Sequence, residues 1–171
     1  GNAPILPRAI DIAESQADAI GNGSAYFVKS NTDYIQADNH NLLVNGNATM
    51  ACWAKATAIS QEQFFGGHHN SKRFYFGISS ANKPFFGVQD QASSDGDVLN
   101  ISANEWNHYA LVANGGTATF YFNGINVHTM SYTQASASNP DNLFVIGARN
   151  DGGTGAVNVA SSWDGYIGQY G

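Results

Sequence analysis

Histidine, asparagine and aspartate side chains occur in two segments of the chain that have the residue types of loops. One segment contains His68 and His69, and the other contains Asn150 and Asp151. Planar polar groups of this kind can bind the hydroxyl pairs of a sugar, while an aromatic face covers the C–H surface of its ring. Trp163 supplies such an aromatic group near the end of the chain. We expect these five residues to bind carbohydrate; the alternative is that they are ordinary turn residues.

A second candidate surface lies on a predicted β-hairpin. Asn123-Gly124 separates two strand-like runs, and this dipeptide is a strong hairpin signal because both central residues of a type I′ turn need positive φ. The turn sets a register in which Tyr121 faces Asn126 and Thr119 faces His128 on one side of the hairpin. The other side then carries Phe122, Ile125, Phe120 and Val127. We expect Tyr121, Asn126 and His128 to form a shallow glycan platform, or else an ordinary solvated sheet face.

The densest acidic loop is Asp95-Gly96-Asp97, which makes it the best candidate for a cation site. Calcium takes several oxygen ligands, usually including two or more carboxylates that converge from loops. Asp95 and Asp97 are therefore the predicted calcium ligands, although their spacing does not match an EF-hand loop. The remaining acidic candidates are Asp38, Asp90, Asp151 and Asp164.

Catalytic motifs are missing from the sequence. Glycosidases need two carboxyl groups that flank the scissile bond, whereas Glu14, Glu62 and Glu105 are isolated and no strand-like segment alternates acidic residues. The chain also has no Gly-x-Ser-x-Gly elbow and no phosphate-binding loop. We expect a protein that is not an enzyme.

Composition narrows the classes of partner. The 171 residues carry a net charge of −6, which argues against nucleic acid, since binding without sequence preference depends on Lys and Arg neutralising phosphates. No apolar run approaches the roughly 20 residues that cross a bilayer, so membrane insertion is not expected. Cys52 is the only cysteine, and its apolar surroundings predict a buried, inert thiol.

Short β-rich runs between turn residues predict an all-β domain over residues 22–171, preceded by an N-terminal arm or linker over residues 1–21. In one run, Phe74, Phe76 and Ile78 alternate with Arg73, Tyr75 and Gly77, which is the period of a strand. The predicted strands cover residues 25–30, 34–38, 49–57, 63–67, 73–79, 84–89, 98–101, 106–114, 143–148 and 166–170, together with the two hairpin strands.

Several segments resemble one protein family. Trp106-x-His108-x-Ala110, followed by an aromatic-rich strand that ends at Asn123-Gly124, resembles the laminin G-like, or pentraxin-like, branch of the concanavalin A-like lectin/glucanase superfamily. The other matching segments, in order, are Tyr34-Ile35, Cys52-Trp53-Ala54-Lys55, Val145-Ile146-Gly147 and Trp163-Asp164-Gly165-Tyr166-Ile167. The resemblance implies a jelly-roll β-sandwich of two antiparallel sheets that binds glycans or proteins, often with calcium. A frequent acidic position of the family is occupied here by Gly168-Gln169.

We interpret the chain as a non-catalytic carbohydrate (glycan) recognition module of an extracellular, cell-surface or virion-surface protein. Its partner would be a glycan or a host-surface polysaccharide, and the cofactor that the resemblance implies is calcium. The alternative is a structural, decoration or protein-interaction domain of a phage or viral particle that binds no sugar. In that case residues 1–21 would attach it to a larger protein assembly.

Overall fold

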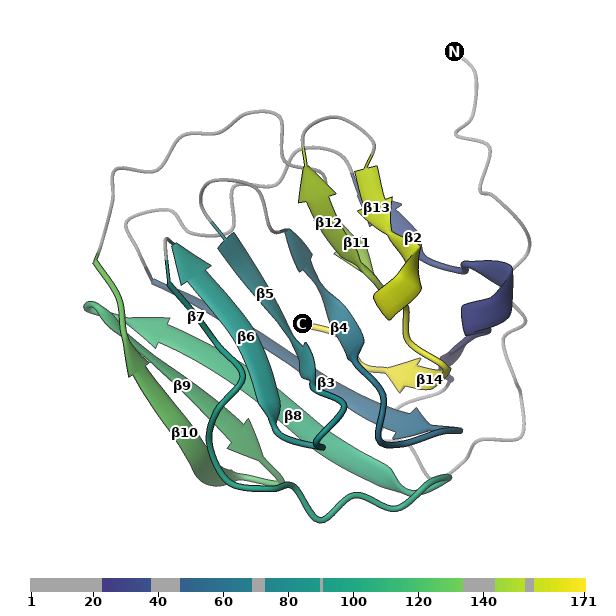
Figure 1. The fold of residues 1–171 in the computed structure, drawn as a ribbon, viewed down its shortest axis with the longest axis horizontal. Coiled ribbons are helices and arrows are strands. Elements are labelled where there is room, and N and C mark those ends of the chain that lie inside the picture. Colours follow the sequence, from purple (N-terminus) through teal and green to yellow (C-terminus); the bar gives the residue numbers. More distant parts are fainter. Residues whose placement is uncertain (1–22, 38–46, 69–72, 90, 134–143, 153–155) are drawn as a thin grey trace.

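A computed structural model describes residues 23–37, 47–68, 73–89, 91–133, 144–152 and 156–171. The predicted N-terminal arm and His69 lie outside these residues. Two β-sheets pack face to face as a sandwich (Figure 1). The only helical elements in the described ranges are two short 3-10 turns, Lys29–Asn31 and Val159–Ser161. The predicted all-β jelly-roll sandwich is confirmed. No helix in the described part of the chain is long and apolar enough to cross a membrane.

The first sheet has six antiparallel strands, and its neighbours are far apart in the sequence. Their spatial order is β1 (Ala25–Phe27), β14 (Gly165–Gly168), β3 (Ala48–Ala56), β8 (Trp106–Asn114), β9 (Thr117–Phe122) and β10 (Ile125–Ser131). The first and last strands of the described residues therefore pair with each other. This crossover brings residues near both ends of the described chain onto one sheet face.

The second sheet follows the order β13 (Ala156–Asn158), β12 (Arg149–Gly152), β4 (Gln63–His68), β5 (Arg73–Ile78), β6 (Pro84–Gln89) and β7 (Gln91–Ser93). The strand β11 (Phe144–Ile146) pairs with both β4 and β2 (Ile35–Ala37). The strands of this second sheet pair antiparallel except for β12 and β4, which pair parallel with Asn150 opposite His68.

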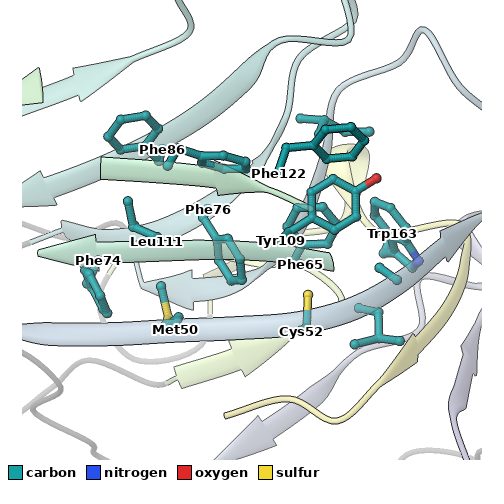
Figure 2. Close-up of a cluster of buried hydrophobic side chains, with 14 of the residues drawn as sticks. Met50, Cys52, Phe65, Phe74, Phe76, Phe86, Tyr109, Leu111, Phe122 and Trp163 are labelled. Atoms are coloured by element: carbon teal, nitrogen blue, oxygen red, sulfur yellow. The ribbon is translucent and has the colours of Figure 1, made fainter. Parts of the chain in front are cut away.

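Aromatic rings fill the space between the sheets (Figure 2). The ring centroid of Phe65 lies 4.3 Å from that of Tyr109 and 4.7 Å from that of Trp163. Phe74, Phe76 and Ile78 are fully buried, as predicted for β5, but Tyr75 between them is also only 1% exposed, so burial does not alternate along this strand. Cys52 is buried as expected, and removal from water raises the pKa of its thiol well above the usual value.

The predicted hairpin is confirmed at its turn and wrong beyond it. Asn123 and Gly124 have φ values of 50° and 81°, and Tyr121 lies opposite Asn126. A β-bulge at Val127 then shifts the register by one residue, so that His128 faces Phe120 and Thr129 faces Thr119. The backbone carbonyl of Val127 accepts the N–H of Asp97 at 3.1 Å. A loop from outside the hairpin therefore binds the extra residue, and no pattern within the hairpin sequence could indicate it.

Residues 98–101 form no strand, which corrects one predicted element. Leu99 and Ile101 still enter the core, whereas Val98 is 66% exposed. The N–H of Leu99 bonds to the carbonyl of Asn82 at 2.8 Å, so a single contact with another loop replaces a strand ladder. The short strands β7, β12 and β13 were not predicted.

Candidate functional site

The outer face of the six-stranded sheet carries a row of side chains that crosses four strands. Tyr26 on β1 lies opposite Tyr166 on β14, which lies opposite Lys55 on β3, which lies opposite Trp106 on β8. The rings of Tyr26 and Tyr166 are 4.5 Å apart between centroids. The Lys55 ammonium lies 4.5 Å from the ring centroid of Tyr166 and 5.4 Å from that of Trp106. These four residues are called the aromatic row below.

Trp53 and His108 extend this surface by one register position. They face each other across β3 and β8, with ring centroids 5.4 Å apart. On the far side of Trp53 the partner is Gly168, which has no side chain. Both rings are partly exposed, so the surface offers two further flat groups beside the aromatic row.

Tyr121 and Asn126 complete the surface at its far edge. Across the next register position the outward residues are Ala51, Ala110, Tyr121 and Asn126. The predicted pair of Tyr121 and Asn126 is thus confirmed on the outer face, where Tyr121 is partly exposed and Asn126 exposed. We call the aromatic row together with Trp53, His108 and Tyr121 the aromatic face.

Strand alternation explains why these residues point outward. On β3, Cys52, Ala54 and Ala56 are buried in the core, so the residues between them, Trp53 and Lys55, must lie on the opposite side. The same period on β8 buries Tyr109 and Leu111 and turns Trp106 and His108 outward. An antiparallel sheet with one face on a core is usually polar on the other face. Here that face is rich in partly exposed aromatic rings instead.

The charge of this sheet differs from that of the whole chain. The six strands contain no aspartate or glutamate, although the chain carries 13 acidic and only 7 basic residues. Lys55 lies on the outer face of these strands. Glu105 is exposed, one residue before β8 begins. The aromatic face is therefore locally more positive than the chain's average.

His128 does not belong to this surface, which corrects its predicted place beside Tyr121. The bulge at Val127 turns His128 to the inner side, where its ring lies 5.6 Å from that of Phe86 in an edge-on contact. Its Nε2 and the Ser93 hydroxyl are 2.8 Å apart. Thr129 takes the outward position instead, with its hydroxyl 3.4 Å from that of Thr119 and within 3.2 Å of the Asn126 amide nitrogen.

Trp163 is also misplaced by the sequence prediction. It is 0% exposed and packs against Phe65 in the core. A sugar cannot stack on a ring that has no accessible face, so Trp163 is a core residue. Its backbone N–H bonds to the Gly147 carbonyl at 2.7 Å, which holds the segment before β14 against the other sheet.

The predicted loop site at His68 and Asn150 is part of the sheet instead. His68 ends β4 and is 3% exposed, while Asn150 on β12 is 1% exposed. Burial lowers the pKa of His68 from its usual 6.5 to about 4, because the charged imidazolium loses its hydration there. His68 is therefore neutral at pH 7. Asp151 lies on β12, but its side chain is outside the described part of the chain.

Asp95 and Asp97 lie in the loop that docks on the β10 bulge. Both are exposed, and the N–H of Asp95 bonds to the Ser93 hydroxyl at 3.2 Å. Within the described ranges no three or more His, Cys, Asp or Glu side chains are grouped so that they could hold a metal ion. Calcium at Asp95 and Asp97 stays a prediction.

Most of the aromatic face was not predicted from the sequence. In the sequence, four of its residues stand out only as parts of the family resemblance, namely Trp53, Lys55, Trp106 and His108. A signal was nevertheless present on β3, where Trp53 and Lys55 alternate with Cys52, Ala54 and Ala56. What the sequence lacks is the pairing of β1, β14, β3 and β8, which brings the separate residues together.

Comparison with known proteins agrees with this architecture. Residues 29–170 match a family model described as the concanavalin A-like lectin/glucanases superfamily, whereas no curated protein sequence matches the chain. Domain 4 of the GH43 extracellular arabinanase AbnA from Geobacillus stearothermophilus, in complex with arabinotriose, has a TM-score of 0.66 at 14% identity. That match covers 95% of this chain and 74% of the other.

Two further solved structures are similar in fold. The native heptameric SAP-like pentraxin of Limulus polyphemus has a TM-score of 0.58 at 22% identity, covering 80% of this chain and 67% of that chain. The CBM40 of Ruminococcus gnavus IT-sialidase, bound to α2,3 sialyllactose, has a TM-score of 0.55 at 14% identity, covering 78% and 88%. The family match spans most of the chain, and the chain belongs to the concanavalin A-like lectin/glucanases superfamily.

Proposed function

We propose that this domain is a non-catalytic glycan-binding module of an extracellular protein, and that the aromatic face is its binding surface. The observation that carries the proposal is the aromatic row with Trp53 beside it, a set of partly exposed rings on a sheet face that is ordinarily polar. Sugar rings present C–H surfaces that pack on such faces.

The dimensions of the surface favour an oligosaccharide over a single sugar. The aromatic row crosses four neighbouring strands, and at about 4.8 Å between strands it extends over roughly 14 Å. Polar groups for hydroxyls are present beside the rings, namely His108, Asn126 and the hydroxyls of Tyr26, Tyr121 and Tyr166. We expect binding to be shallow and to strengthen with chain length.

The similar structures support the glycan class without identifying the sugar. The arabinanase domain is described in complex with arabinotriose, and the sialidase CBM40 with sialyllactose. The non-catalytic part of the proposal is supported by the carboxylates of the described strands. Within the strand bounds Asp151 is the single acidic residue, whereas glycosidases use a pair.

A glycan array with the full chain tests the proposal. We expect saturable binding that Trp53→Ala and Trp106→Ala each weaken at least tenfold while the thermal unfolding transition remains cooperative. Phe85→Ala is the matched control, because Phe85 is a partly exposed ring on the outer side of the other sheet, near Phe64 and Tyr75. An array with no bound glycan, or loss of binding in the Phe85 variant alone, would contradict the proposal. Repeating it with calcium and with a chelator tests Asp95 and Asp97.

A further inference from the structure

We infer that the aromatic face binds a linear oligosaccharide of three or more units along a diagonal from Trp53 to Tyr121, and that His108 hydrogen-bonds to the hydroxyls of the middle unit. This inference rests on the proposed function and adds the length of the ligand, its path and the residue that recognises its hydroxyls. Three observations support it: the open sides of these two aromatic rings, the distance between them, and the place of His108 between them.

The rings of the aromatic face differ in how far other side chains enclose them. The ring of Tyr166 lies between Tyr26 on β1 and Lys55 on β3, with the Tyr26 centroid and the Lys55 ammonium each 4.5 Å from its own centroid. Trp53 differs, because its partner on β14 is Gly168, which adds no side chain on that side. A sugar can therefore pack on Trp53 more readily than on Tyr166.

Tyr121 is the second ring with an open side. It is partly exposed on β9, between Ala110 and Asn126 in the register, and no ring or cation in the described part of the chain packs against it. The Asn126 amide nitrogen lies 3.2 Å from the Thr129 hydroxyl. An amide has two N–H donors and two acceptor lone pairs, so Asn126 can also bind a hydroxyl of a sugar that packs on Tyr121.

The separation of Trp53 and Tyr121 fits the first and third units of a linear oligosaccharide. The two residues stand on β3 and β9, with β8 between them. They differ by one outward position along the strands, because Trp53 pairs with His108 and Tyr121 pairs with Ala110. With about 4.8 Å between strands and about 6.8 Å between successive outward residues, their Cα atoms lie roughly 12 Å apart. Adjacent sugar rings are closer than this, so one unit must lie between the two that stack.

His108 is placed to bind that intervening unit. It stands on β8, between the two rings, and its ring centroid lies 5.4 Å from that of Trp53. Asn123 holds the backbone of His108 through its N–H and its carbonyl, each at 2.8 Å. Among the residues that the structure describes, neither ring nitrogen of His108 has a hydrogen-bond partner. Both nitrogens can therefore bond to neighbouring sugar hydroxyls, and little conformational entropy is lost because the ring is already restricted.

A chain-length series tests the diagonal path. Arabino-, xylo- and cello-oligosaccharides of two, three and four units are titrated into the full chain by calorimetry. In the series that binds, we expect affinity to rise at least tenfold from two units to three, because only the longer ligand reaches both open rings, and less than threefold from three to four. Equal increments for every added unit, or no increase from two units to three, would overturn the inference. Because only the ligand is altered, this result does not depend on whether a variant folds.

Variants then assign the two ends of the path. We expect Trp53→Ala and Tyr121→Ala each to lower the affinity for the trisaccharide to that for the disaccharide, since one terminal unit loses its ring. The disaccharide should be affected much less, because it still spans His108 and the remaining ring. Phe85→Ala, on the other sheet, is the control and should retain the tenfold step. If both single variants weaken the two ligands by the same factor while thermal unfolding stays cooperative, the diagonal path is excluded.

Two substitutions of His108 test its role. His108→Phe retains a ring beside Trp53 and removes both nitrogens, whereas His108→Gln retains a donor and an acceptor. We expect His108→Phe to weaken the disaccharide and the trisaccharide by the same factor, at least fivefold, because both ligands place a unit there. His108→Gln should retain most of the affinity. Full affinity in His108→Phe, or equal losses in the two variants, would exclude hydrogen bonding by His108.

The two levels of the proposal fail differently. Glycan binding that Trp53→Ala and Trp106→Ala weaken, without a step between two and three units, would retain the glycan module and overturn the diagonal path. Absence of binding by every glycan of the array and of the three series would overturn both.

Discussion

Asn123 joins the hairpin turn to His108 on the neighbouring strand. Its side-chain Oδ1 accepts the backbone N–H of His108 at 2.8 Å, and its own N–H donates to the His108 carbonyl at 2.8 Å. Its amide nitrogen also donates to Asn107 Oδ1 at 2.9 Å. The turn residue is therefore hydrogen-bonded to β8 through both its backbone and its side chain. These bonds hold in place the strand that carries Trp106 and His108.

We expect Asn123→Gly to destabilise the domain even though glycine suits the positive φ of 50° at this position. The substitution removes two side-chain hydrogen bonds, which together contribute about 1–2 kcal/mol. Urea unfolding measures the loss, and Asn123→Asp, which retains the acceptor for His108, should lose less. If Asn123→Gly leaves the free energy of unfolding unchanged, the hydrogen bonds to β8 contribute nothing and turn conformation alone accounts for the stability of this region.

Gly96, in the loop on the β10 bulge, should not tolerate a side chain. Its φ is +108°, and an added Cβ would lie 2.7 Å from the Cβ of His128 and 2.9 Å from the carbonyl of Val127. We expect Gly96→Ala to cost about 2–4 kcal/mol from strain and overpacking. Gly115→Ala is the matched comparison, because Gly115 has φ +58° and nothing within 4 Å. We expect it to cost about 1 kcal/mol, measured by chemical denaturation; equal losses would argue against close docking of this loop.

His68 should make the folded domain sensitive to mild acid. Its pKa is about 4 in the fold and 6.5 in an unfolded chain, so between these values the unfolded state binds more protons. Stability is therefore retained at pH 7 and lost as pH falls below 6.5, by about 2 kcal/mol at pH 5. Unfolding free energies of the unmodified protein and of His68→Gln, measured at both pH values, check this. If the two proteins show the same pH dependence, His68 is not its source.

Substitutions of Trp163 and of Tyr121 should have different effects, the first on stability and the second on glycan binding. Trp163→Ala removes a fully buried ring from contact with Phe65, and we expect it to cost about 3–5 kcal/mol of unfolding free energy. Tyr121→Ala alters a partly exposed residue of the sheet face, and we expect about 1 kcal/mol or less together with weaker glycan binding. Thermal unfolding and array binding are measured on both. A stable Trp163→Ala, or a strongly unfolded Tyr121→Ala, would reverse their assignment.

The strands and the turn could be predicted because their signals are local. Alternation on β3 and on the middle of β8 separates buried from outward residues, and Asn123-Gly124 reverses the chain by its own conformational preference. The bulge at Val127 could not be predicted in this way, because a loop more than 25 residues earlier binds its carbonyl. That one-residue shift exchanged His128 for Thr129 on the outer face.

Most of the longer strands, several core phenylalanines and the family could be predicted from the amino-acid sequence. Those properties follow from hydrophobic period and turn chemistry, which act over a few residues. Which exposed residues form one surface depends on the pairing of distant strands. Tyr26 and Tyr166 are neighbours because β1 pairs with β14, and Lys55 lies between Tyr166 and Trp106 because β3 pairs with both β14 and β8. Long-range strand pairing depends on how all the strands bury their apolar faces together, so no single segment specifies it.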